Sequence, residues 1–326
     1  MLSETTATAP GKLMLLGEYA VLDGSPSVVI AVNRRARVRV RTGAEHNLVI
    51  APEICDRYLP FSRDDEGKVH WGPMDEATRE RLAMLTHLIE RFAPDDAVEI
   101  ETDTSAFFEE GIKLGFGSSA AVTVAVASAL SGEALSLPEL VELHRDMQDG
   151  RGSGFDIAAS RIGGVCRYQF RPVPVAEPLQ LPDGLLMRCV WTGSAASTTA
   201  FLRGLDAVGP RREAINDLMA VASQVIADLK DDPGSWVRAV EEYTVALQAF
   251  ARATTLPIFA GGHSDILELA SQHGVAYKPS GAGGGDIGVA VSADPAAMQS
   301  FLTALRQTDH RPVNARPDPE GLLLSP

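Results

Sequence analysis

Residues 113–132 read KLGFGSSAAVTVAVASALSG, a glycine-rich turn followed by two serines and a run of small apolar residues. Alanine and valine also suit a β-strand, but the length of the run and its small side chains favour a closely packed, buried helix. Ser118 or Ser119 is a suitable N-cap for that helix, and Gly132 lies just past its expected end. This stretch therefore predicts a glycine loop that leads into a core helix.

The loop before that helix is suited to bind an anion. Gly115 and Gly117 allow a ligand to approach the backbone, and the first N–H groups of a helix have no intrahelical partner. A serine hydroxyl at this place can ligate Mg²⁺, as the Ser or Thr of a P-loop does. A true Walker A motif is excluded, because the sequence contains no Gly-Lys-Ser or Gly-Lys-Thr.

Three other interpretations of the loop stay open at this point. Gly115, Gly117 and Ala120 match a G-x-G-x-x-A dinucleotide fingerprint, but that motif needs a buried strand before it, and FFEEGIK is a poor one. The nucleophile elbow G-x-S-x-G is matched only in part, because Ala121 stands at its last position. The third interpretation is a glycine-capped loop before a core helix, with no ligand.

Further glycine loops carry other polar groups. APGKLMLLGEY (residues 9–19) contains Lys12, which by itself suits an exposed strand edge. GRGSGFDIAAS (residues 150–160) contains Asp156, which by itself suits a helix N-cap. KPSGAGGGDIG (residues 278–288) has five glycines in eleven residues, and such a backbone can approach a ligand closely. Phosphoryl transfer needs a phosphate cradle, a metal ligand, a cation and a carboxylate, and the loops together supply all four.

Composition limits the classes of partner. The chain has 326 residues, of which 45% are hydrophobic and 22% charged, and its net charge is −14. That acidity argues against nucleic acid as the main partner and requires a local group of cations at any anion site. We find no signal peptide and no apolar stretch of about 20 residues, so we expect a cytoplasmic protein without a membrane segment. The three cysteines are widely spaced and indicate neither a zinc site nor a disulfide framework.

The remaining patterns indicate an α+β protein. In RRARVRVRT (residues 34–42) apolar residues alternate with arginines, which predicts a half-buried strand with a basic face. Helical spacing follows from Asp75, a suitable cap, to Phe92, and again over residues 137–148 with Pro138 in the first turn. Strands dominate early and helices later, with two helical segments between residues 211 and 252.

Prolines cluster between residues 171 and 182, so we expect a domain over residues 1–175 and a second over residues 176–326. We expect the proline-rich tail RPDPEGLLLSP (residues 316–326) to be loosely held. His263, beside a glycine turn, is interpreted as a surface loop residue.

Three segments together resemble the signature motifs of the GHMP kinases, the family of galactokinase, homoserine kinase and the mevalonate kinases. They are APGKLMLLGEYAVL (residues 9–22), KLGFGSSAAVTVA (residues 113–125) and YKPSGAGGGDIGVAV (residues 277–291), in the family's order and spanning nearly the whole chain. The resemblance implies a GHMP kinase fold, with an N-terminal domain like part of ribosomal protein S5 (domain 2-like) and a C-terminal ferredoxin-like domain. It also implies a site between the two domains that uses ATP and Mg²⁺.

Two more segments resemble the phosphomevalonate kinase branch of the family. They are GSGFDIAAS (residues 152–160) and WTGSAASTTAFL (residues 191–202). The implied reaction transfers a phosphoryl group from ATP to 5-phosphomevalonate, in a monomer or homodimer. Mevalonate kinase activity is the alternative. A decarboxylase of the same superfamily and a kinase-like sensor without turnover are more distant alternatives.

The resemblance assigns roles residue by residue. Lys12 and Asp156 are the implied catalytic residues, and Ser119 is the implied Mg²⁺ ligand. Mevalonate kinases carry a metal-binding Glu eleven residues before the catalytic Asp, where this chain has Arg145, so a second protein ligand is in doubt. The implied ATP-binding residues are Lys113, Gly115, Gly117, Ser118, Ser119 and Ala120. The implied substrate-binding residues are Ser153, Ser197, Thr198, Lys278, Ser280, Gly281, Gly283 and Gly284.

Overall fold

The computed structural model describes residues 3–195 and 211–326. Two long antiparallel strands form its centre, β1 (Ser3–Leu16) and β2 (Ser27–Thr42). They are joined through the 3₁₀ turn η1 (Ala20–Asp23), where Gly24 takes a left-handed conformation. Ala9 lies opposite Ala36, and the register shifts between Pro10 and Gly11. Lys12 is the next residue after this irregularity in the strand pairing.

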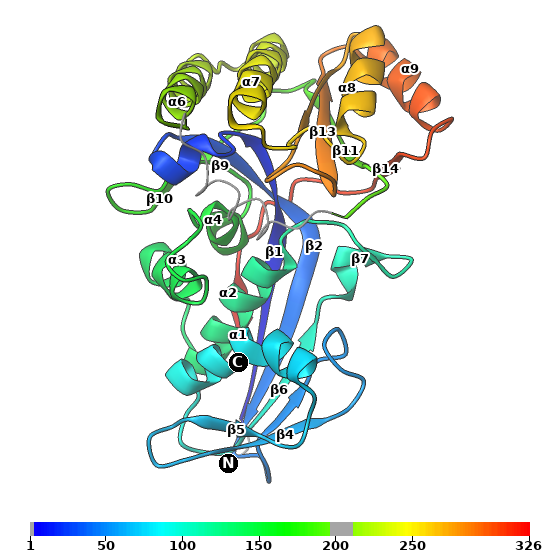
Figure 1. Cartoon of the computed structure of the whole chain (residues 1–326). Coiled ribbons are helices and arrows are strands. Elements are labelled where there is room, and N and C mark those ends of the chain that lie inside the picture. The colour runs from blue at the N-terminus through cyan, green and yellow to red at the C-terminus, as the bar shows by residue number, and fades with distance from the viewer. Residues whose placement is uncertain (1–2, 196–210) are drawn as a thin grey trace.

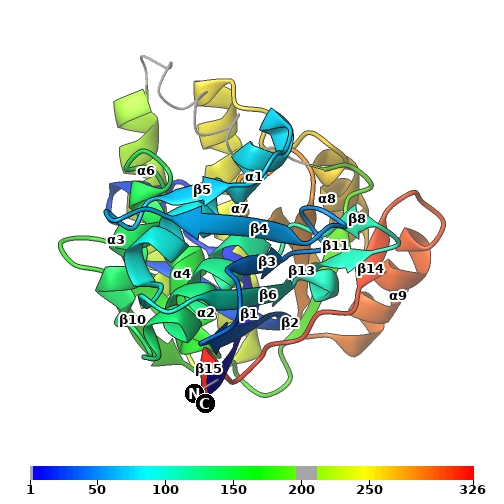
Figure 2. The same cartoon turned by 90° about the horizontal axis from the view of Figure 1, so that it is seen from below.

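The first sheet is built outward from β2, in the order β10-β9-β2-β6-β3-β4-β5, and β1 pairs with both β2 and β15. Part of this order can be followed in Figure 2. The outer strands are β3 (Leu48–Ile50), β4 (Leu59–Arg63), β5 (Val69–Trp71), β6 (Val98–Asp103), β9 (Val165–Gln169), β10 (Val175–Leu179) and β15 (Leu323–Ser325).

The alternating arginine segment is a half-buried strand, as predicted. Ala36, Val38 and Val40 of β2 are buried, and the arginines between them point to the other face. Arg39 pairs with Glu101, and Arg41 pairs with Glu99 at 2.5 Å. The basic face is therefore neutralised by the acidic face of the adjacent strand β6.

Helices α2 and α4 cover one face of β1 and β2, and α1 and α3 pack against them (Figure 1). Helix α2 (Ser118–Ser131) is buried along almost its whole length, and Gly132 ends it in a left-handed conformation, as predicted. The expected serine cap is wrong, because left-handed Gly117 is the N-cap and no side chain caps the helix. The others are α1 (Glu76–Phe92), α3 (Leu137–Asp146) and α4 (Phe155–Ile162).

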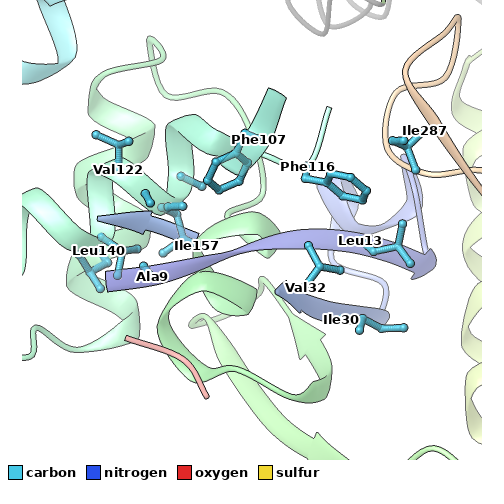
Figure 3. Packing of buried hydrophobic residues seen from close by; sticks show 14 of the residues in the cluster. Ala9, Leu13, Ile30, Val32, Phe107, Phe116, Val122, Leu140, Ile157 and Ile287 are labelled. Atoms are coloured by element: carbon cyan, nitrogen blue, oxygen red, sulfur yellow. The ribbon is translucent and has the colours of Figure 1, made fainter. Parts of the chain in front are cut away.

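The caps of α1 and α3 follow the sequence signals. Asp75 accepts a hydrogen bond from the Thr78 amide at the start of α1. Ser136 and Glu139 form a capping box before α3, with proline in the first turn. Figure 3 shows part of the core between sheet and helices, to which Ala9 of β1, Val122 of α2 and Ile157 of α4 belong.

A second, smaller sheet has the order β12-β13-β11-β14 and lies at one end of the long strands (Figure 1). It comprises β11 (Leu186–Trp191), β12 (Ala276–Pro279), β13 (Ile287–Ser292) and β14 (Arg311–Val313). Helices α7 (Pro233–Thr254), α8 (His263–Gln272) and α9 (Pro295–Leu305) pack against this sheet, and α6 (Arg211–Ala227) packs against α7. The two short strands β7 (Phe108–Glu109) and β8 (Ile112–Lys113) precede the loop at Gly115, after the 3₁₀ turn η2 (Ser105–Phe107).

The tail is firmly docked, so the expectation that it is loosely held is wrong. Strand β15 pairs with residues 6–8 of β1, and Asp318 forms an ion pair with Arg35 at 2.7 Å. A Cβ on Gly163 would lie 2.2 Å from the Gly321 amide nitrogen, so the backbone of the tail passes directly over the end of α4. These contacts are made by residues far apart in the sequence, which local composition does not report.

We retain the division at residues 175 and 176 as a proposal, with one qualification. Strands β10 and β15 lie in the range 176–326 for most or all of their length, yet they pair within the first sheet.

Over residues 3–195 and 211–326, none of the helices is both long and apolar enough to cross a membrane.

Candidate active site

Lys12 lies between two glycine loops. Its Nζ donates to the Gly115 carbonyl at 3.1 Å, and its backbone N–H donates to the Phe116 carbonyl at 2.8 Å. A Cβ on Gly117 would lie 2.9 Å from Lys12 Cγ, and a Cβ on Gly281 would lie 3.5 Å from Lys12 Nζ. Residues from three distant parts of the sequence therefore meet around one half-buried lysine.

The loop at Gly115 presents the start of α2 as an anion site. Gly115 and Gly117 both have φ near +77°, a region that side chains rarely adopt, and this brings the loop back against Lys12. The positive end of the helix dipole and its free N–H groups point out of the same loop. Ser118 and Ala120 are buried in the first turn, whereas Ser119 is exposed.

Ser119 presents an exposed hydroxyl at the start of α2. Within residues 3–195 and 211–326, its Oγ makes only a long 3.7 Å contact, with Met84 Sδ, so the oxygen is accessible to a ligand. Within the part of the chain that the structure describes, there is no group of three or more His, Cys, Asp or Glu residues placed to hold a metal ion. One hydroxyl is nevertheless compatible with Mg²⁺, which takes nucleotide oxygens and water as its other ligands.

Asp156 is the second residue of α4 and lies in the first turn of the helix. The N-cap of α4 is Gly154, which has a left-handed conformation. A purely capping role for Asp156 is therefore wrong. Its side chain is 24% exposed, and its Oδ1 lies 4.0 Å from Nδ1 of the buried His144. Ser153, three residues earlier, is buried, and its Oγ has no hydrogen-bond partner among the residues that the structure describes.

Arg145 lies beside the acidic loop. Its guanidinium donates to the Gly152 carbonyl and stacks 4.7 Å from the centre of the Phe170 ring. The phenyl ring of Phe155 lies 5.7 Å from Lys12 Nζ and joins this loop to the lysine. The Arg145 side chain is thus held between the acidic loop and the Phe170 ring.

The charge of Lys12 reflects opposing influences. Burial lowers the pKa of its ammonium below the usual value, and Lys113 acts in the same direction. Asp156, Asp286 and Glu18 raise that pKa. The three carboxylates surround the lysine from different loops, so they favour the protonated amine that could stabilise developing negative charge.

A buried ion pair lies at the start of the third glycine loop. Lys278 Nζ pairs with the Glu18 carboxylate, and both side chains are excluded from solvent, with exposures of 0% and 1%. This corrects the expectation that Lys278 binds substrate, because its amine is used inside the protein. Ser280 is buried nearby, and its Oγ accepts a 2.9 Å hydrogen bond from the Met14 amide, which does not use the hydroxyl hydrogen.

Sequence reasoning missed three groups of this site. Glu18 and Asp286 lie within quoted motifs, but no local pattern distinguishes them from solvent-exposed acids. His263 is fully buried, so its interpretation as a surface residue is wrong. Its Nε2 lies 2.9 Å from the Gly285 carbonyl, which can only accept, and its Nδ1 lies 2.8 Å from the Tyr277 hydroxyl. Burial lowers the pKa of His263 to about 4.

The structure thus brings Lys12, Gly115, Gly117, Asp156 and Gly281 around one place. Lys113 is exposed on β8, near enough to influence the Lys12 charge. Left-handed Gly283 and Gly284 continue the third loop. The proposed substrate residues Ser197 and Thr198 lie outside the described residues.

Comparisons with known proteins identify the family of this chain. The family model for the GHMP kinases N terminal domain matches residues 77–164. Phosphomevalonate kinase of Streptomyces sp. (strain CL190) is 32% identical, over 87% of this chain and 88% of that protein. Mevalonate kinase of Pyrococcus horikoshii is 27% identical, over 99% and 98%. The crystal structure of the Lin0012 protein from Listeria innocua superposes with a TM-score of 0.83 at 21% identity, covering 99% of both chains.

The glycine loops, the lysine between them and the acid nearby form the candidate site, and the chain belongs to the GHMP kinase family. The fold is the GHMP kinase fold, with mixed α and β content, as the resemblance implied. The dinucleotide and nucleophile-elbow interpretations of the loop at Gly115 are therefore set aside.

Proposed function

We propose that this protein is a kinase of the mevalonate pathway that transfers the γ-phosphoryl group of ATP to 5-phosphomevalonate, giving 5-diphosphomevalonate. The convergence of Lys12, the loop at Gly115, Asp156 and the loop at Gly281 carries the proposal. The 32% identity to a phosphomevalonate kinase over most of both chains supports the choice of acceptor.

In this proposal the start of α2 holds the nucleotide. The N–H groups of the first turn and the left-handed glycines cradle the ATP phosphates, and Lys113 approaches them from β8. Ser119 would hold Mg²⁺, which neutralises phosphate charge when bound. The phosphate-binding residues are Lys113, Gly115, Gly117, Ser118, Ser119 and Ala120.

The acceptor occupies the opposite side of Lys12. Ser153, Ser280 and the loop residues Gly281, Gly283 and Gly284 line this side, with Ser197 and Thr198 as further candidates. The unpartnered Oγ of Ser153 is a donor and acceptor that a ligand oxygen could satisfy. A polyanionic acceptor also suits Arg145, whose guanidinium replaces the acid found in mevalonate kinases.

A phosphate acceptor changes the role of Asp156. The second pKa of a phosphate monoester is about 6, so at neutral pH its oxygen is already largely ionised and needs little help from a base. Asp156 therefore orients Lys12 and the acceptor, while Lys12 stabilises the charge that develops between the two phosphates. An alcohol acceptor would need Asp156 as a general base.

Mevalonate kinase is the second candidate, because several relatives carry that name over nearly the whole chain. Coupled ADP-release assays with 5-phosphomevalonate, mevalonate, homoserine and galactose separate the candidates. We expect turnover with 5-phosphomevalonate, loss of turnover with excess EDTA, and strongly reduced turnover in a Lys12→Met control. Turnover of mevalonate alone would overturn the choice of acceptor, and CO₂ release from 5-diphosphomevalonate would indicate a decarboxylase.

A further inference from the structure

A buried carboxylate links the first and third glycine motifs. Glu18 Oε1 accepts hydrogen bonds from Lys278 Nζ and, at 3.4 Å, from the Gly281 N–H. Its other oxygen, Oε2, is buried and has no hydrogen-bond partner in the described part of the chain. One oxygen of Glu18 therefore contacts both ends of residues 278–281, where β12 turns into the third loop.

This ion pair is a poor device for stability alone. Taking two charges out of water carries a large desolvation penalty, and replacing a buried pair with apolar side chains is often neutral or stabilising. The unpartnered Oε2 adds to that penalty. A carboxylate that is buried at this cost is expected to do something that an apolar side chain cannot do. Here the carboxylate accepts a hydrogen bond from the Gly281 N–H.

Neighbouring residues hold the same junction. Tyr19 has φ of +63°, a strained conformation for an aromatic residue, and its hydroxyl donates to the Ala282 carbonyl. The Tyr243 hydroxyl of α7 donates to the Glu18 carbonyl at 2.6 Å. Glu18 and Tyr19 therefore both hydrogen-bond to the third loop, and Tyr243 of α7 hydrogen-bonds to the backbone of Glu18.

The loop held in this way lies against the reactive lysine, since a Cβ on Gly281 would be 3.5 Å from Lys12 Nζ. We propose that Glu18 is a positioning residue, which acts through Gly281 to set residues 281–284 against Lys12 for the acceptor. The choice of acceptor rests on the proposed function above, whereas the placement of the loop does not.

Two double variants test this role. Glu18→Gln with Lys278→Met removes both charges but keeps a side-chain oxygen for the Gly281 N–H. Glu18→Met with Lys278→Met also removes both charges and leaves no acceptor. Methionine fills irregular space in cores, and neither variant leaves an unpaired buried charge. Thermal unfolding first establishes that both variants fold. Amide hydrogen exchange of residues 278–286 and steady-state kinetics then compare them.

In the Met/Met variant we expect amide exchange of residues 278–286 to be about tenfold faster than in the Gln/Met variant. We also expect kcat/KM for 5-phosphomevalonate to be about tenfold lower. Both changes correspond to the loss of one hydrogen bond. KM for ATP should differ by less than about twofold, because the loop at Gly115 is untouched. Equal exchange in the two variants overturns the proposal.

If the Met/Met variant does not fold, Glu18→Asp provides the same readout, because it keeps the charge and shortens the side chain. Faster exchange in residues 278–286 then supports the proposal, and unchanged exchange overturns it. If the wild-type protein does not phosphorylate 5-phosphomevalonate, the proposed acceptor fails, while the exchange comparison still decides the role of Glu18.

Discussion

Gly117→Ala separates the geometry of Lys12 from the stability of the fold. The added methyl group meets two obstacles. The residue has φ of +76°, and its Cβ would lie 2.9 Å from Lys12 Cγ and 3.1 Å from Lys12 Cε. The backbone strain acts on folding, whereas the contact acts on the side chain that we place at the reaction centre.

The two effects have different sizes. A left-handed conformation costs an L-residue about 1–2 kcal/mol, which corresponds to a decrease in Tm of about 2–8 °C for a chain of this order of length. Lys12 is flexible, so it relieves the contact by moving away from the loop. A displacement of about 1 Å at a reacting group can reduce the rate about 100-fold, which is the loss of kcat that we expect.

Gly132→Ala is the matched control, because Gly132 has φ of +71° at the other end of the same helix and no atom lies within 4 Å of the position that its Cβ would take. Thermal unfolding and ADP-release kinetics should show similar losses of Tm for both variants and a loss of kcat for Gly117→Ala only. Full activity in Gly117→Ala, or an equal loss in Gly132→Ala, would refute the proposed position of Lys12.

Three more predictions concern the site, its support and the tail. Lys12→Met should reduce kcat about 10²–10³-fold, the scale of one lost electrostatic donor, and Asp156→Asn should reduce it less if the acceptor is a phosphate. His263 has a pKa of about 4 when folded, below about 6.5 when unfolded, so the unfolded chain binds the extra proton and stability falls as the pH drops through this range. The loss should total about 3 kcal/mol between pH 7 and pH 4 in urea unfolding, and a His263→Gln variant should lack this part of it. Gly321→Ala places a Cβ 2.3 Å from the Arg161 carbonyl, so it should lower Tm and expose residues 315–322 to proteolysis, and unchanged protection there would contradict the tight docking of the tail.

Local signals were sufficient for much of the fold. The alternation in β2, the Asp75 cap of α1 and the proline in the first turn of α3 each act within a few residues, so the sequence displays them directly. The start of α2 was harder to predict. Serine is a good N-cap in general, but here Gly117 takes that position, because the chain must turn against Lys12 before the helix begins.

The motifs located the site, but the partners of individual groups were beyond local reasoning. A lysine such as Lys278 suits an anionic ligand, yet the fold places Glu18, 260 residues away in the sequence, beside it. His263 is buried by Tyr277 and Gly285, which belong to other elements. Charge and polarity show what a side chain can bind, whereas its actual partner depends on which distant segment the fold brings to it.

The pairing of β15 with β1 constrains the order of events during synthesis. Residues 323–325 leave the ribosome about three hundred residues after residues 6–8, which at 5–20 residues per second is a delay of roughly 15 to 60 seconds. Throughout that interval one edge of β1 has no strand beside it, and the nascent chain must be protected there from pairing with other molecules.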